Sequence, residues 1–558
     1  MPDQRILFTM SPRPYRQLVD YAHPFDLFGG RLNAFQGPFT LHSFNRPAAL
    51  HLLAQNVPFP SKVLEFPSAD EIRDEIRKGY EYIALHVHSN SEFPKSMEVC
   101  DWIRTLSPET KIILGGHGVT CYAEEFISDE EIEEQADDVC WGDGVGFIRG
   151  LFGLKGEVDP ILPPMDFFLE MMPEKTNQAG VIVPGVGCVN RCPFCATSHF
   201  FDGRFIPLQT PASMYRIMER VQKDHRNIDR FALFDELYLS RQKAVRDLGE
   251  LIYNGDRVNL ATVSYFTFSD FRSIVQYDPD DLVRWGVQRV FLGVESTLKP
   301  LPKTRGIHLR GVVESLHSRG IETILSVMFG LPHHNHENIQ VEMDQFQELG
   351  GVFNQVTIES PIVGTPNWET FKRQGRIDGE FSVEDLHGYS TAYSHPHFDR
   401  GEILELAKEL QRRIYRETGP SIMKAIEVEL NGYEHCLHHP DPVLRVQKTA
   451  YLRRSLRNQA PILSVIQQRG ETERTRSRAA EILGRYSSLL GGEDPHFRKK
   501  ADRLLKRHDR EVSRQEGSGA PTIPYPDMAA IETWYEGAGS SPISSPSSPS
   551  QSPLPVGI

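Results

Sequence analysis

Three cysteines lie within eight residues of one another, in the segment Cys188-Val-Asn-Arg-Cys192-Pro-Phe-Cys195. Residues 180–187, directly before them, form an apolar run that enters a glycine-rich turn, which predicts a strand followed by a loop. A [4Fe-4S] cluster normally takes four cysteine thiolates, so three thiolates in one loop would leave one iron open to a ligand from outside the protein. The sequence therefore predicts an iron-sulfur loop at the end of a strand.

Two other interpretations of these cysteines stay open at this point, a zinc knuckle and three thiols without a shared role. A structural zinc site would need a fourth cysteine or histidine at a fixed spacing. His199 is the nearby candidate, and its spacing fits poorly.

Length and composition indicate a large protein with more than one domain. A chain of 558 residues exceeds the size that one core serves, so two or three domains are expected. No apolar run approaches the roughly 20 residues that span a bilayer, and the polar N-terminus is unlike a signal peptide. Seven cysteines, three of them clustered, favour a reducing compartment in which thiols stay free to bind metal. We expect a cytoplasmic protein.

Residues 1–160 alternate short apolar runs with helical segments, which is the pattern of a doubly wound (Rossmann-like) parallel sheet in an α/β protein. Helices are expected to include residues 46–55, 68–79 and 96–106. The expected strands are residues 5–9, 61–66, 82–88, 111–115 and 138–141.

The carboxyl ends of these strands are the expected ligand site, because doubly wound sheets bind ligands there. Glycines at such ends let a ligand approach the backbone closely, although they also simply make tight turns. These ends are residues 88–91, 115–118 and 142–144, and the candidate binding residues among them are Ser89, Ser91, Gly115, Gly116 and Gly118.

The spacing Cys-x3-Cys-x2-Cys, with Phe194 directly before the last cysteine, resembles the signature of the radical S-adenosylmethionine (radical SAM) superfamily. The resemblance implies that the open iron binds the amino and carboxylate groups of SAM and delivers an electron that releases a 5'-deoxyadenosyl radical. Four later segments match the superfamily's pattern in order, namely residues 231–236, 290–296, 320–332 and 355–366. The implied architecture is a partial (β/α)6 barrel over residues 175–395.

The same resemblance implies SAM ligands. Asp235 and Glu236 end an apolar strand, where carboxylates would accept charge-assisted hydrogen bonds from the SAM ammonium group. For Asp235 alone, a structural role at a helix N-terminus stays equally open. Gly293, Glu295 and Ser296 belong to a strand similar to the "GxES" strand, whose polar end faces the SAM carboxylate and ribose.

A glycine-rich doubly wound domain directly before the cysteine loop resembles the cobalamin-binding domain of class B radical SAM enzymes. This resemblance covers roughly residues 1–370 and implies that the corrinoid's nucleotide tail lies beside Ser89, Ser91, Gly115, Gly116 and Gly118. One departure is that residues 1–160 contain no Asp-x-His-x-x-Gly string, which many cobalamin domains use to supply an axial histidine. Cobalamin is therefore expected without histidine ligation. His42, His86, His88 and His117 are possible contacts.

The C-terminal part changes character. Residues 400–513 have helical periodicity and predict a helical domain that caps or extends the barrel mouth. Within it, residues 435–439 contain three histidines and a cysteine beside Pro440, and we expect a loop there in preference to a metal site. Residues 514–558 are rich in Ser, Pro and Gly and are predicted to be disordered.

Charge is unevenly distributed along the chain. The net charge is -14, yet residues 441–513 contain 17 Lys and Arg against 9 Asp and Glu. An anionic partner such as a membrane surface, a nucleic acid or a reductant protein is one explanation, and a solvated helical face is the simpler one. We expect an electron donor of the flavodoxin or ferredoxin type, possible peripheral contact with an anionic membrane, and no stable nucleic-acid partner.

These observations favour a cobalamin-dependent radical SAM enzyme, most simply a C-methyltransferase acting on an unactivated carbon. The cofactors would be a [4Fe-4S] cluster on Cys188, Cys192 and Cys195, S-adenosylmethionine and cobalamin. One alternative uses the same cofactors for cyclisation, oxidation or C–C coupling without methyl transfer. Another is an iron-sulfur binding or sensor protein. The substrate is expected to be a small molecule or a lipid, with a lipid favoured, and its identity stays open.

Overall fold

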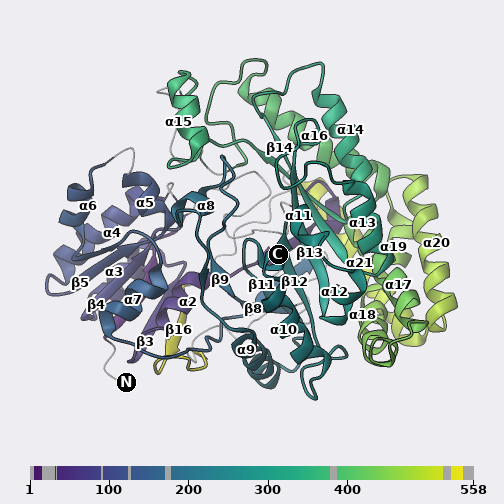
Figure 1. Ribbon diagram of the computed structural model, residues 1–558, viewed down its shortest axis with the longest axis horizontal. Helices are drawn as coiled ribbons and strands as arrows, with labels where there is room; N and C mark the ends of the chain where they lie inside the picture. The colour runs from purple at the N-terminus through teal and green to yellow at the C-terminus, as the bar shows by residue number, and fades with distance from the viewer. Residues whose placement is uncertain are drawn as a thin grey trace.

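The computed structural model of the protein describes residues 5–14, 32, 34–89, 92–123, 127–169, 178–377, 386, 388–518 and 530–544. Two sheets organise them, one in the N-terminal part and one in the middle of the chain, and a group of helices follows (Figure 1). The α/β class predicted from the sequence is confirmed.

The N-terminal sheet has seven strands in the order β17-β16-β3-β1-β4-β5-β6. The last five are mutually parallel and match the five predicted strands. The strand order reverses direction at β1, so ligands are expected beyond the carboxyl ends of β1 and β4. The five strands are β1 (Ile6–Met10), β3 (Ser61–Glu65), β4 (Tyr82–His86), β5 (Lys111–Gly115) and β6 (Asp138–Cys140).

Helices cover both faces of this sheet. On one face α2 and α7 pack through Leu50, Ala54 and Ile148, and on the other α3, α4 and α6 pack through apolar side chains such as Ile72 and Ile103. The predicted helices at 46–55, 68–79 and 96–106 are confirmed with slightly different bounds. The helices are α2 (Ala48–Ala54), α3 (Ala69–Ile76), α4 (Phe93–Leu106), α5 (His117–Ala123), α6 (Asp129–Gln135) and α7 (Gly144–Phe152).

The second sheet contains six parallel strands that follow one another in chain order, with helices between them. The strands are β8 (Gln178–Ile182), β11 (Arg230–Leu233), β12 (Ser264–Ser269), β13 (Val287–Glu295), β14 (Glu322–Phe329) and β15 (Phe353–Ile358). The helices are α9 (Pro211–Asp224), α10 (Gln242–Tyr253), α11 (Phe271–Ile274), α12 (Pro279–Arg284), α13 (Leu309–Ser318), α14 (Ile339–Leu349) and α15 (Pro366–Arg373).

Two antiparallel strands extend the second sheet beyond β8 and correct the predicted division at residue 160. β7 (Met165–Leu169) pairs with β8, and β2 (Leu41–Phe44) pairs with β7. β2 therefore belongs to the second sheet although it lies within residues 1–160. The edge of the N-terminal sheet beside β3, the nearest strand to β2 in sequence, is occupied by β16.

The C-terminal tail is the clearest correction to the sequence-based prediction. Residues 531–535 form β16 (Ile531–Tyr535), which pairs antiparallel with β3, and β17 (Ile543–Ser544) pairs with β16. Figure 1 shows yellow β16 beside purple β3. The average composition of the tail hid a short run, Ile-Glu-Thr-Trp-Tyr, whose β-branched and aromatic residues favour a strand. The remaining tail residues, 519–529 and 545–558, lie outside the described ranges.

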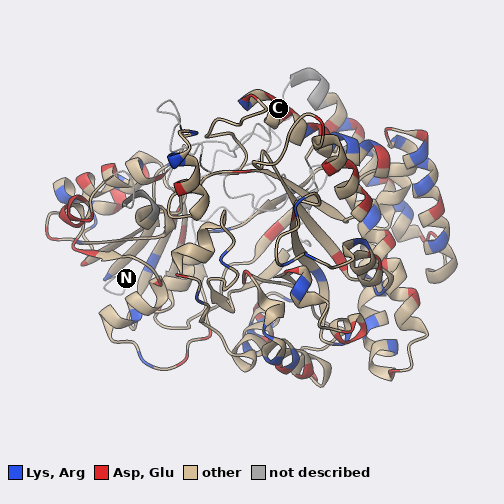
Figure 2. Cartoon of the chain, turned by 45° about the horizontal axis from the view of Figure 1, so that its top comes forward, with Lys and Arg blue, Asp and Glu red and all other residues tan. Residues whose placement is uncertain are grey.

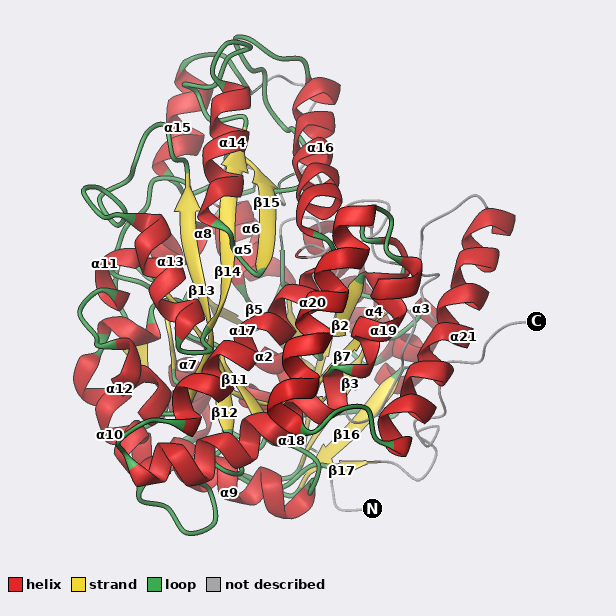
Figure 3. Cartoon of the chain, turned by 90° about the vertical axis from the view of Figure 1, so that its right-hand side faces the viewer, coloured by secondary structure: helices red, strands yellow, loops and turns green. Residues whose placement is uncertain are grey.

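The helical C-terminal part is confirmed, but its position differs from the prediction. Its helices are α16 (Arg400–Thr418), α17 (Ser421–Leu437), α18 (Thr449–Gln459), α19 (Pro461–Arg469), α20 (Glu473–Leu490) and α21 (Pro495–Ser518), with a π-helical turn at Leu444–Lys448 (Figure 3). α17 continues through His435 and Cys436, where a loop was expected.

Helix α18 and the turn before it close the amino ends of the barrel strands, not the mouth at their carboxyl ends. Tyr451 Oη lies 2.6 Å from Ser264 Oγ at the start of β12, and Lys448 donates to Gln288 Oε1 over 2.9 Å at the start of β13. Arg230, the first residue of β11, donates to Ser455 Oγ over 2.8 Å. Buried polar groups at the strand starts thus find partners on the helices, and the opposite mouth stays free for a site.

No described helix combines the length and the apolarity needed to cross a membrane.

Candidate functional site

The cysteine loop lies at the carboxyl end of β8, between the short strand β9 (Gly185–Val186) and helix α8 (Ala196–Phe200). Hydrogen bonds within the loop fix its course. Cys195 N–H donates to Cys192 O over 3.0 Å, and the buried Ser198 hydroxyl donates to Cys188 O over 3.0 Å while it accepts from Arg191 N–H over 2.8 Å. The loop therefore presents its three cysteines from a conformation that the protein itself holds.

Gly187 is required for this conformation. Its φ is +85°, in the left-handed region, and a Cβ there would collide with the backbone oxygen of Arg204. The glycine-rich turn seen in the sequence thus shapes the entry to the cysteine loop.

The zinc alternative fits the geometry poorly. His199 Nε2 lies 3.2 Å from the backbone oxygen of Cys192, so this ring is engaged within the loop. A tetrahedral zinc would hold sulfur atoms about 3.8 Å apart, given Zn–S bonds of ~2.3 Å. Among the described residues, the three thiols do not form a set whose ligand atoms all lie within 4.8 Å of one another. The wider spacing suits a cubane better than a single ion.

Burial raises the pKa of all three thiols, that of Cys195 to about 12. The negative charge of Glu236 raises the pKa of Cys188 and Cys195 further. Without a metal these groups are neutral thiols at pH 7, so metal binding must displace their protons. The three cysteines can therefore act as thiolate ligands only when a cationic cluster compensates their buried negative charge.

Glu236 is the predicted SAM ligand whose surroundings suit that role best. Its side chain is solvent-exposed, yet burial by the surrounding protein, followed by the charge of Asp235, raises its pKa to about 7. The carboxylate is thus accessible to solvent although protein surrounds it. Among the described residues, no hydrogen bond or ion pair holds Glu236, so it can accept a cationic ligand.

Asp235 has a structural role, the alternative that the sequence left open. Its side chain is fully buried, accepts from Leu237 N–H over 3.0 Å and forms an ion pair with Arg241. The Arg241 guanidinium also stacks 3.8 Å above the Phe205 ring. Asp235 therefore fixes the turn after β11 and leaves ligand binding to its neighbour.

Glu295 ends β13 beside the cysteine loop and is paired with a lysine that sequence reasoning missed. Lys303 Nζ lies 2.5 Å from Glu295 Oε1, and its positive charge lowers the pKa of Cys192, although burial keeps that pKa raised overall. The pair crosses Gly293, where a Cβ would collide with both side-chain ends. Gly293 thus makes room for this ion pair. No motif pointed to Lys303, because seven residues of loop separate it from Glu295.

Ser296 faces away from the role that the resemblance implied. Its hydroxyl donates to Glu342 Oε2 over 2.6 Å and lies 3.1 Å from His333 Nε2. Ser296 therefore belongs to a separate group of polar side chains, together with Glu342 and with His333 of the loop after β14.

Glu359 was also missed by the sequence analysis. It is fully buried at the end of β15, and burial raises its pKa to about 7. Asn367 connects it to the cysteine loop, because Asn367 Nδ2 donates to Glu359 Oε1 over 2.5 Å and Asn367 N–H donates to Pro193 O over 3.0 Å. These two hydrogen bonds connect the end of β15, the sixth parallel strand of the second sheet, to the cysteine loop that follows β8, the first parallel strand.

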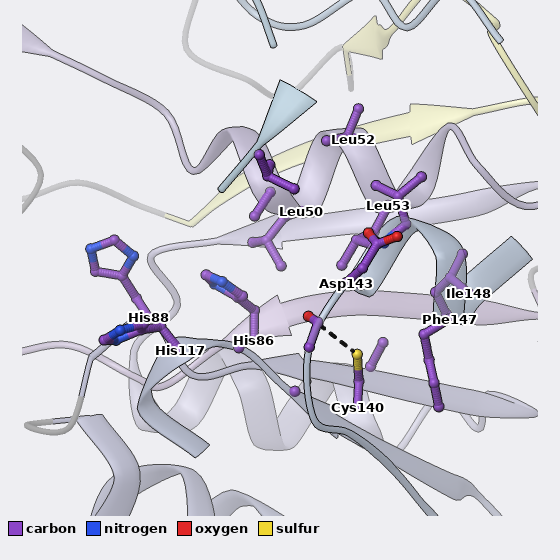
Figure 4. Close-up of a pocket in the computed structure, with 18 of the residues that line it drawn as sticks. Leu50, Leu52, Leu53, His86, His88, His117, Cys140, Asp143, Phe147 and Ile148 are labelled. Atoms are coloured by element: carbon purple, nitrogen blue, oxygen red, sulfur yellow. Dashed lines mark hydrogen bonds between the residues drawn. The ribbon is translucent and has the colours of Figure 1, made fainter. Parts of the chain in front are cut away.

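A cavity of about 460 Å³ lies between the N-terminal sheet and the cysteine loop. One wall is made by the carboxyl ends of β4, β5 and β6, another by the leucines of α2, and a third by α8, the helix that directly follows Cys195 (Figure 4). His117 of α5 and Phe200 of α8 meet across the two parts, with ring centroids 5.2 Å apart. The lining of this cavity includes Leu50, Leu53, His86, Gly116, His117, Gly142 and Phe200.

The five predicted cobalamin contacts divide into three groups. Gly115 and Gly116 line the cavity. Gly118 and Ser89 do not, because Gly118 packs against the backbone oxygen of Ser89, where a Cβ would collide. Ser91 lies outside the described residues. Close packing thus explains the glycine at position 118, whereas Gly115 and Gly116 are placed where a ligand could approach the backbone.

Gly142, which the sequence already placed at a strand end, is an open position of the cavity wall. A Cβ on Gly142 would meet nothing within 4 Å, whereas one on Gly116 would collide with Val87 O. His86 and His88 also line the cavity, and among the described residues the buried Nδ1 of His86 has no hydrogen-bond partner. Burial lowers the pKa of His86 to about 3, so its imidazole is neutral. The side chain of His42 is not among those described.

No protein-family model and no curated protein matches the chain. Solved structures with some similarity include two of the radical S-adenosylmethionine methyltransferase TsrM from Kitasatospora setae. One holds cobalamin and a [4Fe-4S] cluster and aligns with 82% of this chain and 99% of its own, at 14% identity and a TM-score of 0.48. The other holds tryptophan and a SAM analogue and aligns with 92% and 100%, at the same identity and TM-score.

A third, pyruvate kinase from Cryptosporidium parvum, aligns with 94% of this chain and 88% of its own, at 9% identity and a TM-score of 0.21. TM-scores below 0.5 do not establish a common fold.

Proposed function

We propose that this protein is a cobalamin-dependent radical SAM enzyme that methylates a carbon of a small-molecule substrate. The observation that carries the proposal is the position of α8. This helix directly follows Cys195 and also forms one wall of the cavity at the carboxyl ends of the N-terminal strands. A cluster-binding loop and a site for a large, mainly apolar cofactor would thus face each other across one helix.

Residues of this chain can hold each cofactor. Cys188, Cys192 and Cys195 would supply the three thiolates of a [4Fe-4S] cluster. Glu236 would accept the ammonium group of SAM through charge-assisted hydrogen bonds, and the ion pair of Glu295 and Lys303 would offer both charges nearby. The apolar side chains of Leu50 and Leu53 and the open backbone at Gly142 suit the flat ring of a corrinoid.

The bound cofactors would supply one-electron cleavage of SAM and methyl transfer. In net terms, a C–H substrate, two SAM molecules and two electrons from a reductant give the methylated product, S-adenosylhomocysteine, methionine and 5'-deoxyadenosine. The protein's own part is to hold the substrate between the two cofactor sites and to exclude water. A flavodoxin- or ferredoxin-type protein is the proposed electron donor.

The basic C-terminal segment gives little support to a membrane partner. Figure 2 shows positive and negative residues intermixed on the C-terminal helices. Several of the arginines are paired with carboxylates, for example Arg469 with Asp509 at 2.9 Å and Arg485 with Glu434 at 2.6 Å. A solvated helical face accounts for these charges, so a soluble small molecule is preferred to a lipid as the substrate class.

A bulky side chain at Gly142 is expected to exclude the corrinoid and leave the iron-sulfur site intact. Gly142→Phe would project into open space, so the fold should tolerate the ring. Gly150→Phe is the matched control, because Gly150 lies on the exposed side of α7 with nothing within 4 Å of a Cβ. Anaerobically purified protein would be loaded with hydroxocobalamin, reductant and SAM, desalted, and analysed for bound corrinoid by mass spectrometry.

Wild type and Gly150→Phe should retain methylcobalamin, and Gly142→Phe should retain at least about tenfold less. Equal retention in all three proteins would place the corrinoid elsewhere. Retained corrinoid that never becomes methylated in wild type would contradict the methyltransferase proposal. No retained corrinoid in wild type would leave a radical SAM enzyme without cobalamin.

Glu236→Gln is expected to weaken SAM binding without unfolding the protein. Removing a charge-assisted hydrogen bond costs about 1.5–3 kcal/mol, which corresponds to a roughly tenfold to hundredfold higher Kd. Isothermal titration of the cluster-loaded protein with SAM would measure it. Asp235→Asn is the informative comparison, because it should lower the melting temperature by disturbing the turn held by Leu237 and Arg241. An unchanged Kd in Glu236→Gln would remove Glu236 from the SAM site.

A further inference from the structure

A second cluster of metal-ligating side chains lies at the mouth of the second sheet, on the loop that follows β14. This loop, residues 330–338, carries His333, His334 and His336, and Glu342 lies in the first turn of the helix α14 behind it. Ser296, the residue after β13, reaches the same group from the neighbouring strand. Side chains from two strand ends and one helix thus converge.

The spacing of these atoms suits a single tetrahedral ion. One ligand atom each from His333, His334 and Glu342 lies within 4.8 Å of the other two. His334 Nε2 is 3.4 Å from Glu342 Oε2, and Ser296 Oγ is 3.1 Å from His333 Nε2 and 2.6 Å from Glu342 Oε2. Bonds of about 2.0–2.1 Å to a tetrahedral zinc place its ligands roughly 3.3 Å apart.

His334 provides an independent indication of a ligand. It is fully buried, and among the described residues neither ring nitrogen has a hydrogen-bond partner. Its Nε2 lies near Glu342, but the two groups are not aligned for a hydrogen bond. Buried polar side chains nearly always have partners, and an exception indicates a water or an ion.

Hydrogen bonds from the residues after β13 hold the Glu342 carboxylate in place. Thr297 N–H donates over 2.6 Å and its hydroxyl over 2.7 Å, both to Oε1. Oε2 accepts from Ser296 Oγ over 2.6 Å and from Leu298 N–H over 3.4 Å, and it is the oxygen that lies near His334 Nε2. The carboxylate is thereby fixed with one oxygen directed at the histidines.

We propose that His333, His334 and Glu342 bind a divalent zinc-class cation, with the Ser296 hydroxyl or a water as fourth ligand. Two imidazoles and one carboxylate form a common three-residue zinc set. The ion would join the carboxyl end of β13 to the loop after β14, directly beside Glu295. It would act as a positioning element for the mouth, and this assignment is independent of the proposed methyltransferase function.

A second triplet in the described part of the chain, Asp280 with His435 and His439, serves as a contrast. His439 Nδ1 accepts from Asp441 N–H over 3.1 Å, so that only Nε2 of this ring faces Asp280, at 3.7 Å from Oδ2. The Arg319 guanidinium also lies 3.3 Å from Asp280 Oδ1 and already supplies a cation. This triplet is explained by ion pairing and is not proposed as a metal site.

The test is elemental analysis together with zinc-edge X-ray absorption on the full-length, cluster-loaded protein. Protein would be equilibrated with Zn²⁺ and washed with a mild chelator. Wild type is expected to keep about one zinc per chain with only nitrogen and oxygen ligands near 2.0 Å. His334→Ala and Glu342→Gln are expected to keep less than about a tenth of that zinc, with iron unchanged at about four per chain.

His334→Cys gives the sharpest outcome and guards against variants that merely misfold. It should retain zinc and add one Zn–S distance of about 2.3 Å, because the new thiolate would be a direct ligand. His336→Ala and His439→Ala are controls that should retain zinc in full. Wild type without zinc, or zinc that persists in His334→Ala and Glu342→Gln, would overturn the assignment. Zinc with sulfur ligands in wild type would place the ion in the cysteine loop and overturn it equally.

Discussion

Replacing Cys192 by Ala is expected to abolish the formation of 5'-deoxyadenosine from SAM. Cys192 is the middle one of the three proposed cluster ligands, in a loop whose backbone is fixed by hydrogen bonds. Two remaining thiolates would not hold a cubane. Iron should fall from about four per chain to less than about one. Anaerobic reconstitution, iron analysis and chromatographic detection of 5'-deoxyadenosine under strong reductant would measure both effects.

Cys436→Ala is the matched control for this experiment. Cys436 is also buried, but it lies in α17 near Lys448, whose side chain reaches the start of β13, whereas the cysteine loop follows the carboxyl end of β8. It should keep its cluster and its activity. Formation of 5'-deoxyadenosine at the wild-type rate in Cys192→Ala would refute the cluster assignment. Intact SAM in the wild type would favour the hypothesis of an iron-sulfur binding or sensor protein.

Deleting residues 530–558 is expected to eliminate corrinoid retention and to destabilise the N-terminal sheet. β16 pairs with β3 along five residues and buries Thr533 and Tyr535. The Tyr535 hydroxyl lies 2.7 Å from Nδ1 of His51, which belongs to the helix α2 that lines the cavity. Loss of the hairpin would therefore release one wall of the proposed cobalamin site.

Tyr535→Ala alone should cost about 3–5 kcal/mol of stability, since it removes a fully buried aromatic ring. Hydrogen exchange at β1 and β3 would report the local effect, and corrinoid binding would report the functional one. A chain that ends at Ser544 is the matched truncation, because it keeps both strands of the hairpin. The strand would be dispensable if the chain lacking residues 530–558 bound corrinoid as well as the chain ending at Ser544.

Local order was predictable from the sequence because it depends on residues close together in the chain. The five parallel strands of the first sheet, and β8, β11, β13, β14 and β15 of the second, follow from short apolar runs bounded by glycine and polar residues. The cysteine loop follows in the same way, since three thiols within eight residues need no distant partner to be brought together. The helical periodicity after residue 400 likewise depends only on residues within each helix, so it predicts the helices without information about what they pack against.

The composition of the tail, by contrast, gave the wrong prediction for residues 530–544. Strand β16 exists because the exposed edge of β3 offers backbone groups for pairing and pockets for Thr533 and Tyr535. That edge is formed nearly 470 residues earlier in the chain, as the pairing of Thr533 with Val63 shows. No pattern inside the tail can encode such a partner.

By itself the sequence determined where the three cysteines cluster and how strands and helices alternate, because spacing and periodicity are local. Only the tertiary structure decided which carboxylate is free for a ligand. Asp235 and Glu236 are neighbours, yet one is buried in an ion pair with Arg241 and the other is exposed to solvent. The same holds for Lys303 and for the histidines around Glu342, since their roles depend on which strand ends meet. Charge, burial and partners at such places arise from long-range packing, which sequence spacing does not record.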